Sequence, residues 1–447
     1  MHLQSLHVVY IAASLSVACA TAGQASFASM SRELSLAEAH TSKAREQDEL
    51  ALRAAELDRS ALIRAVLDRN PSVESARQAW RAALARYRQA GAYEDPMLMG
   101  SFAPLSIGST HSRFGFEVGV SQRIPLGGKL NAQSELAVAE ARAAESDYAE
   151  ARSRLALVAS ELYDDYFVAV RSLEIQAQHL ALMDALKQNA SAAYASGHAS
   201  VQDTLQAEGE LARLEYQSSV YETQRQVAVA QINALLHRDP ELPLPQPPAA
   251  LRERDSVAAS APDKLLAQRP DIAAAHARVR VAEARRQVAE SEYHPDLTVE
   301  LNYNSMWDMP EHRFMAGVSL NVPLQRERRQ AAIDEAAAMR ASAESETQNM
   351  TDTARGELAV AARRIDEAER AVALFEQRIV PIARERIEAA RAGFISAQNS
   401  FTALIEAERA LRSAELELLM AQSDVSKRKA ALDRALGRMP IVSEVQP

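Results

Sequence analysis

The sequence repeats itself once, and this repeat is the strongest constraint on the fold. Five short motifs of the first half return in the same order in the second half, roughly 200 residues later. The matched pairs are Asn70-Pro71 with Arg269-Pro270, Asp95-Pro96 with His294-Pro295, Pro125-Leu126 with Pro323-Leu324, Gly197/Ser200 with Gly393/Ser396, and Asp239-Pro240 with Met439-Pro440. We therefore expect a tandem duplication in which both halves contain the same elements.

A proline-rich segment separates the two repeats, and proline sustains neither a helix interior nor a strand ladder. We expect this segment to be an extended linker on the surface. The predicted order is a signal segment at 1–28, a charged extension at 29–57, the first repeat at 58–238, the linker at 239–262, the second repeat at 263–440 and a tail at 441–447.

The N-terminus has the composition of an export signal. Residues 8–20 are apolar or small, and polar sequence follows them, as in the apolar core of a signal peptide. Two cleavage interpretations remain open. The run Leu15-Ser16-Val17-Ala18-Cys19 resembles a bacterial lipobox, which would acylate Cys19, whereas small residues up to Ala28 also suit an ordinary signal peptidase. Both interpretations place the mature protein outside the cytoplasm.

Each repeat contains paired segments in which apolar and polar residues alternate, predicting β-hairpins at 97–126 and 296–324. The strands are about ten residues long, which suits a tilted transmembrane strand. A half-buried hairpin on a soluble core is the alternative. Two features favour the membrane. Aromatic residues make up only 5% of the chain, and the polar face carries Glu117 and Glu300, which a water-filled lumen tolerates.

A helix precedes each hairpin, and a long helix with a returning partner follows it. We expect long helices at 131–196 and 326–392, each about 100 Å long, and return helices at 199–236 and 395–436. Two apolar heptad seams on one helix indicate neighbours on both sides, as in a wall of helices. Pro381 falls within the second long helix, where we expect a kink.

Four strands cannot close a membrane barrel, because an open sheet edge is not tolerated in lipid and known barrels have eight or more strands. Several chains must therefore pool their strands. Two chains would supply eight strands and three would supply twelve, and these observations do not choose between them.

This combination resembles the TolC family of outer-membrane efflux factors. The resemblance rests on the duplication, Asn70-Pro71, Arg269-Pro270-Asp271, the run Pro125-Leu126-Gly127-Gly128-Lys129, and the Gly/Ser pairs. It implies a homotrimer with a twelve-stranded β-barrel and a long α-helical periplasmic barrel. It also implies passive export of substrate delivered by a proton-driven inner-membrane pump and a periplasmic adaptor protein. The charged extension departs from the family pattern.

The resemblance also assigns residues. It places adaptor-docking tips at Gly197, Ser200, Gly393 and Ser396, with the glycines providing left-handed turns. It places the pore constriction at Asp203, with Asn399 at the matching position of the second half. A ring of carboxylates around a threefold axis favours cations.

Other function classes fit poorly. We expect no enzyme, cofactor or metal site, because Leu130 follows Gly127-Gly128-Lys129 where a P-loop needs Ser or Thr, and no His-Glu-x-x-His is present. A net charge of −10 without a basic stripe argues against nucleic acid. A periplasmic coiled-coil scaffold outside the membrane is the rival class. Within the family, Asp95-Pro96-Met97 resembles the cation-efflux (CusC/CzcC-like) branch, with drug efflux and type I secretion as alternatives.

Overall fold

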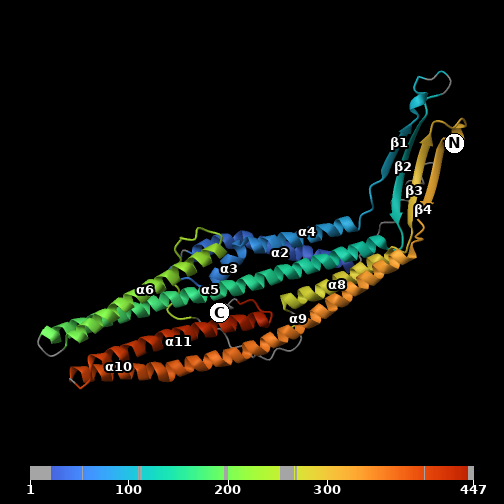
Figure 1. The fold of residues 1–447 in the computed structure, drawn as a ribbon. Helices are drawn as coiled ribbons and strands as arrows, with labels where there is room; N and C mark the ends of the chain where they lie inside the picture. The colour runs from blue at the N-terminus through green and yellow to red at the C-terminus, as the bar shows by residue number, and fades with distance from the viewer. Residues whose placement is uncertain are drawn as a thin grey trace. The chain divides into compact units, whose positions relative to one another are not determined.

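The computed structural model describes residues 22–52, 54–108, 110, 113–195, 200–251, 266, 269–396 and 398–440. The predictions for Cys19, Gly197 and the tail at 441–447 lie outside these residues. The helices are α2 (Ala22–Ala51), α3 (Arg59–Arg69), α4 (Pro71–Ala90), α5 (Lys129–Ala195), α6 (Val201–Leu235), α8 (Pro270–Ser291), α9 (Arg326–Leu374), α10 (Val380–Ile395) and α11 (Phe401–Ala435) (Figure 1). The strands are β1 (Met97–Phe102), β2 (Phe116–Pro125), β3 (Asp296–Asn304) and β4 (Phe314–Leu320).

The chain divides into two compact units. The first unit comprises residues 1–38, 77–146 and 274–347, and the second unit comprises residues 39–76, 147–273 and 348–447. The first unit contains all four strands, and the second contains the helical turns that join α5 to α6 and α10 to α11.

The four strands of the first unit form one antiparallel sheet in the order β1-β2-β3-β4 (Figure 1). Its register places Leu98 opposite Val120, Val120 opposite Leu301 and Leu301 opposite Ala316, so one face is a continuous apolar band. The neighbouring positions put Glu117, Ser121, Glu300 and Asn302 on the other face. Because side chains alternate across a strand, the predicted division into an apolar and a polar face follows directly from the register.

A buried ion pair joins the sheet to α5 at the end of the Pro-Leu-Gly-Gly-Lys run. The ammonium of Lys129 lies 2.8 Å from a carboxylate oxygen of Asp296, and both residues are buried. Arg123 contacts the same carboxylate from β2. Gly127 and Gly128 have φ values of +70° and +77°, the left-handed region that turns the chain from strand to helix.

Alanine substitutions at Gly127 and at Gly128 should distinguish the cost of backbone strain from the cost of a steric clash. Both substitutions place a side chain in the left-handed region, which costs about 1–2 kcal/mol. A Cβ at Gly127 would also overlap the ring of His294, whereas nothing lies within 4 Å of a Cβ at Gly128. Gly127→Ala should therefore lower the thermal midpoint further than Gly128→Ala, measured by heat-dependent electrophoretic migration. Equal effects would show that His294 moves aside without cost.

The charged extension is helical as far as Ala51, as part of α2, which begins before it at Ala22. Within the first unit, α2 packs on α4 and α5, with the Phe27 and Tyr87 rings stacked at 4.7 Å between centroids. Met30 is buried, and Arg142 donates a 2.9 Å hydrogen bond to the Ser26 hydroxyl. Burial, together with a hydrogen bond that the protonated Glu145 carboxyl donates to Glu33, raises the pKa of Glu145 to about 7. The extension is therefore attached to the helices that follow it.

The Asn-Pro motif ends one helix and begins the next. Asn70 has extended backbone angles between α3 and α4, and its side chain accepts a 2.9 Å hydrogen bond from the Ser72 N–H. Its amide also donates to the carbonyl of Leu235 over 3.1 Å. In the second repeat Arg269 donates to the carbonyl of Ala435. The two motifs thus perform the same task, tying the start of each repeat to the end of its return helix.

Pro381 does not end the second long helix. A five-residue π-helical segment, Phe375–Ile379, precedes it, and α10 continues to Ile395. Proline has no N–H to donate to the preceding turn, and a wider turn accommodates that missing hydrogen bond.

Candidate functional site

The candidate site lies in the second unit, where the helical hairpin α5–α6 packs against the hairpin α10–α11. Both hairpins contribute to one apolar cluster, formed by Met183, Leu186, Ala190, Ala207, Leu214, Ile387, Ala390, Phe401, Leu404, Ile405 and Ala407. The rings of Phe394 and Phe401 lie 5.4 Å apart beside the second turn. The two helical hairpins whose turns are predicted to dock an adaptor therefore pack together.

Ser200 and Asp203 form a capping box at the start of α6. The Ser200 hydroxyl accepts from the Asp203 N–H at 3.3 Å, and the Asp203 carboxylate accepts from the Ser200 N–H at 3.1 Å. The two side chains satisfy backbone donors that the first helical turn leaves unpaired. Asp203, predicted at the constriction, is half-buried and already holds this cap within the single chain.

In the second half, the residue that caps the return helix is not the serine that the sequence comparison pairs with Ser200. The N-cap of α11 is Ser400, whose hydroxyl accepts from the Ala403 N–H at 3.3 Å. Ser400 therefore occupies the place of Ser200, and Ala403 that of Asp203. Ser396 instead ends α10, where its hydroxyl donates to the carbonyl of Ala392. The Gly-x-x-Ser match was displaced by four residues, so Asn399 is not the counterpart of Asp203.

Gly393 serves packing rather than a left-handed turn. It lies inside α10, and its φ is not positive. A Cβ there would overlap the side chain of Asn399, whose backbone N–H donates to the Gly393 carbonyl at 3.0 Å. The expectation of a left-handed glycine was wrong at Gly393, and Gly197 lies outside the described residues.

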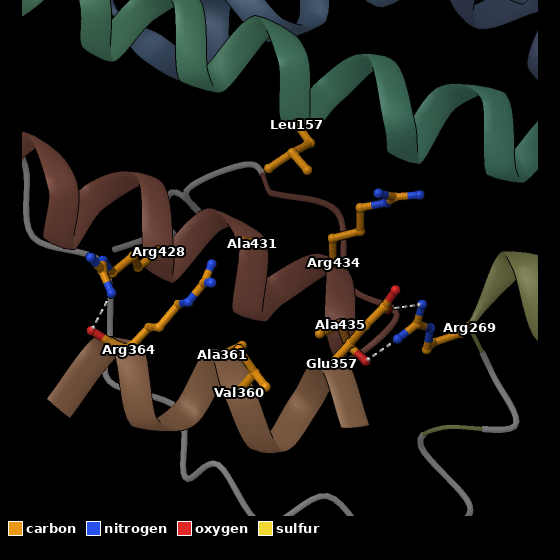
Figure 2. Close-up of a pocket in the computed structure, with 10 residues that line it drawn as sticks. All are labelled: Leu157, Arg269, Glu357, Val360, Ala361, Arg364, Arg428, Ala431, Arg434 and Ala435. Atoms are coloured by element: carbon orange, nitrogen blue, oxygen red, sulfur yellow. Dashed lines mark hydrogen bonds and ion pairs between the residues drawn. The ribbon is translucent and has the colours of Figure 1, made fainter. Parts of the chain in front are cut away.

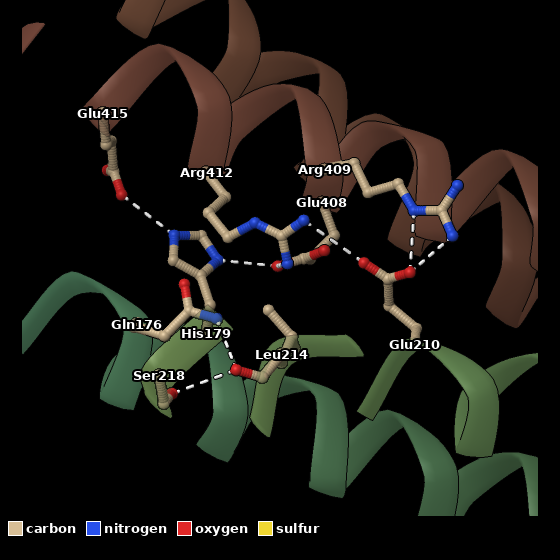
Figure 3. Close-up of polar contacts among 9 residues, drawn as sticks. All are labelled: Gln176, His179, Glu210, Leu214, Ser218, Glu408, Arg409, Arg412 and Glu415. Carbon is tan, nitrogen blue, oxygen red and sulfur yellow. Dashed lines mark hydrogen bonds and ion pairs between the residues drawn. The ribbon is translucent and has the colours of Figure 1, made fainter. Parts of the chain in front are cut away.

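A buried carboxylate links the two hairpins. Glu210 of α6 is 1% exposed and accepts from Arg409 at 2.9 Å and from Arg412 at 3.2 Å, both on α11 (Figure 3). Burial alone would raise the pKa of Glu210, but these two guanidiniums outweigh it and lower the pKa. The carboxylate therefore stays ionised and holds α11 against α6.

A histidine makes the corresponding link from α5. His179 is buried, with its Nδ1 2.8 Å from Glu408 and its Nε2 3.1 Å from Glu415, both on α11 (Figure 3). Burial alone would lower the pKa of His179, but the two carboxylates outweigh it and raise the pKa. Sequence reasoning missed this network. The available signal was a set of charged residues at helical spacing within otherwise apolar seams.

A cavity in the second unit is lined by arginines. This cavity of about 270 Å³ has Arg269, Arg364, Arg428 and Arg434 around an apolar floor (Figure 2). Three of the four are paired with carboxylates, namely Arg269 with Asp271 and Glu357, Arg428 with Asp424 and Glu367, and Arg434 with Glu150. The charges of these three arginines are therefore balanced locally, and we assign no anionic ligand to this cavity.

Among the described residues, no helix is both long and apolar enough to cross a membrane. They also contain no cluster of three or more His, Cys, Asp and Glu side chains placed to hold a metal ion.

Comparison with known proteins identifies the family. The family model described as outer membrane efflux protein matches residues 62–237 and 261–438, one match for each repeat. A search of curated proteins gave no match. Similar solved structures include crystal structures of CusC, with 20% identity over 86% of this chain and 94% of that chain and a TM-score of 0.75.

Two further channels share the fold. The outer membrane protein VceC of Vibrio cholerae is 19% identical over 84% of this chain and 95% of that chain, with a TM-score of 0.71. The open state of the Neisseria gonorrhoeae MtrE outer membrane channel is 18% identical over 87% and 91%, with a TM-score of 0.71. The predicted TolC-like fold with four strands per chain is confirmed. The chain belongs to the outer membrane efflux protein family and is a protein of the outer membrane.

Proposed function

We propose that this chain is the exit duct of a tripartite efflux system, through which substrate from an inner-membrane pump and a periplasmic adaptor passes passively to the exterior. The observation that supports it most directly is the sheet. Its apolar face is open in the single chain, with Leu98 78% and Val318 71% exposed, and β1 and β4 are its edge strands. Lipid would cover that face, and further copies of the chain would pair the edges.

Three copies give a twelve-stranded barrel, which the family resemblance favours over the eight strands of a dimer. The mass of detergent-extracted protein tests this directly, since a duct of this type should have the mass of three chains. A folded monomer that keeps its β signal in circular dichroism would contradict the pooled barrel.

Adaptor docking at the helical turns is the second part of the proposal. Ser200 and Ser396 are exposed beside the two turns, and Gly393 lies next to Ser396. Ser200→Trp with Ser396→Trp should abolish efflux in cells while trimers still assemble, because bulky side chains would block a close helix–helix contact. Ser345→Trp is a matched control, since Ser345 is exposed on α9 and donates to the carbonyl four residues earlier, as Ser396 does. Normal resistance in the double variant would place docking elsewhere.

The substrate class we propose is heavy-metal cations, with drugs or secreted polypeptides as the alternatives. Met97, Met99, Met306, Met309 and Met315 are exposed on and beside the strands, and thioethers suit soft metal ions. An Asp203 ring at the constriction, with Asn399 near it, would favour cations. Deletion of the gene should increase sensitivity to metal salts more than to drugs. The reverse pattern would assign the duct to drug efflux.

The lipid anchor at Cys19 stays a prediction. Intact-mass measurement of the mature protein distinguishes an acylated Cys19 at the N-terminus from simple cleavage after Ala20 or Ala28.

A further inference from the structure

His179 stands between two carboxylates, and its geometry requires a particular protonation state. Both ring nitrogens face acceptor oxygens, Nδ1 toward Glu408 and Nε2 toward Glu415 (Figure 3). A neutral imidazole has one N–H and one lone pair, so it can donate to only one of these oxygens. Its other nitrogen would then face a carboxylate oxygen, lone pair against lone pair. When both carboxyls are ionised, only the imidazolium satisfies both contacts.

The buried charges around His179 lead to the same conclusion. Glu210 and Glu408 have fully buried side chains, and the buried cation that faces them besides His179 is Arg412, at 3.2 Å from Glu210 and 3.9 Å from Glu408. Arg409 of α11 and Arg384 of α10 also face the cluster, but their side chains are 42% and 65% exposed. Solvent screens exposed charges far more than buried ones. Two buried carboxylates therefore match two buried cations only when His179 is protonated.

The remaining neighbours do not replace this charge. Glu415 is partly exposed and is already paired with Arg384 at 3.1 Å. Tyr221 of α6 is near Arg412, and burial raises its pKa, so the phenol stays neutral. On α5 itself, Gln176 donates to the Leu214 carbonyl and carries no charge. One oxygen of Glu408 has no hydrogen-bond partner among the described residues. The other oxygen lies 2.8 Å from Nδ1 of His179, closer than the 3.9 Å that separates it from Arg412.

We propose that His179 makes the packing of hairpin α5–α6 against hairpin α10–α11 proton-dependent. Below neutral pH the imidazolium bridges α5 to α11 and the hairpins stay together. At alkaline pH the proton leaves, the buried carboxylates lose half of their buried counter-charge, and the pairing weakens. This property belongs to the second unit of the chain and does not depend on an adaptor, a pump or a particular substrate.

Proton linkage gives the direction and the size of the pH dependence of hairpin pairing. The pairing binds a proton that the separated hairpins release, so its stability is complete below the ordinary pKa of histidine, about 6.5. Above that value the stability falls until the pH passes the raised pKa of the paired state. For one proton, the equilibrium constant for pairing falls by up to about tenfold per pH unit within this window.

A buried thiol can report the separation. Ala207 of α6 is fully buried in the apolar cluster shared by both hairpins, so a cysteine there is shielded while they are packed. The full-length Ala207→Cys protein in detergent is treated with a maleimide between pH 6 and pH 9. Rates are corrected for the thiolate fraction of a free thiol, and the parent chain measures the background from Cys19. We expect the corrected rate to rise by up to about tenfold per pH unit above pH 6.5.

Three further variants make the test specific. His179→Gln should remove the pH dependence, because glutamine can donate and accept but does not titrate here. Glu415→Gln should make it shallower, because the amide removes one negative charge and can donate to the ring nitrogen. His276→Gln, at an exposed histidine of the first unit, should leave it unchanged. An unchanged pH slope in His179→Gln, or no slope in the parent, would overturn the proposal. Circular dichroism on each variant confirms that the helices are intact.

Discussion

Replacing Asp164 with alanine should destabilise the second unit by about 3–5 kcal/mol, the cost of leaving a buried charge without its partner. The carboxylate of Asp164 on α5 is fully buried and contacts the guanidinium of Arg59, which begins α3 and is itself buried. Arg59 also donates to the Ser426 hydroxyl at 2.6 Å and lies 4.9 Å from the centre of the Tyr163 ring. These neutral contacts orient the guanidinium but do not balance its charge.

The adjacent residue provides the control. Asp165 is also on α5, but its side chain is 51% exposed and pairs with the partly exposed Lys427. Exposed ion pairs contribute up to about 1 kcal/mol, so Asp165→Ala should have a small effect. Chemical unfolding followed by circular dichroism at the helical band measures both variants. Similar small losses would mean that water reaches Arg59 once Asp164 is removed.

The fold could be predicted from the sequence because its strongest signals are periodic and duplicated. The alternation of Val118 and Val120 with polar neighbours needs only the two-residue period of a strand to place them on one face. Asn70-Pro71 marks a helix boundary because proline lacks an N–H, wherever the rest of the chain lies. Such features depend on local chemistry, and local chemistry can be read without knowing the partners.

The site depends on contacts between residues that are far apart in the chain. For these contacts, reasoning from the sequence led either to a wrong prediction or to none. Gly197 and Gly393 look equivalent, yet Gly393 is required because the side chain of Asn399 packs against it inside a helix. Ser200 was paired with Ser396, although the capping contacts pair it with Ser400. Glycine and serine are common in turns. A match between two Gly-x-x-Ser motifs therefore specifies only weakly how the two repeats align.

The buried network shows the same limit more clearly. His179, Glu210 and Glu408 are separated in the sequence but meet at one helix junction. On a helix, charged residues such as these are usually solvated, so composition alone suggests exposed faces. Only the packing of α5 and α6 against α11 reveals that these charges are buried and must compensate one another.

The buried pair at the base of the sheet predicts an equally large effect in the first unit. Asp296→Ala should cost about 3–5 kcal/mol, because the buried ammonium of Lys129 would lose its contact at 2.8 Å. Its remaining partner, Glu292, is 3.5 Å away and half exposed. The loss should appear as a lower temperature for heat-dependent electrophoretic migration. Asp95→Ala, at an exposed aspartate before β1, should change it little.

A double substitution tests whether the charge itself is the cause. Lys129→Met keeps most of the length of the lysine side chain and removes its charge, so combined with Asp296→Ala it leaves no buried ion. Removing both partners of a buried pair is often nearly neutral, whereas removing one is costly. The double variant should therefore recover most of the stability that Asp296→Ala loses. If it does not, the carboxylate acts mainly through Arg123 of β2, and the sheet rather than the strand–helix junction depends on it.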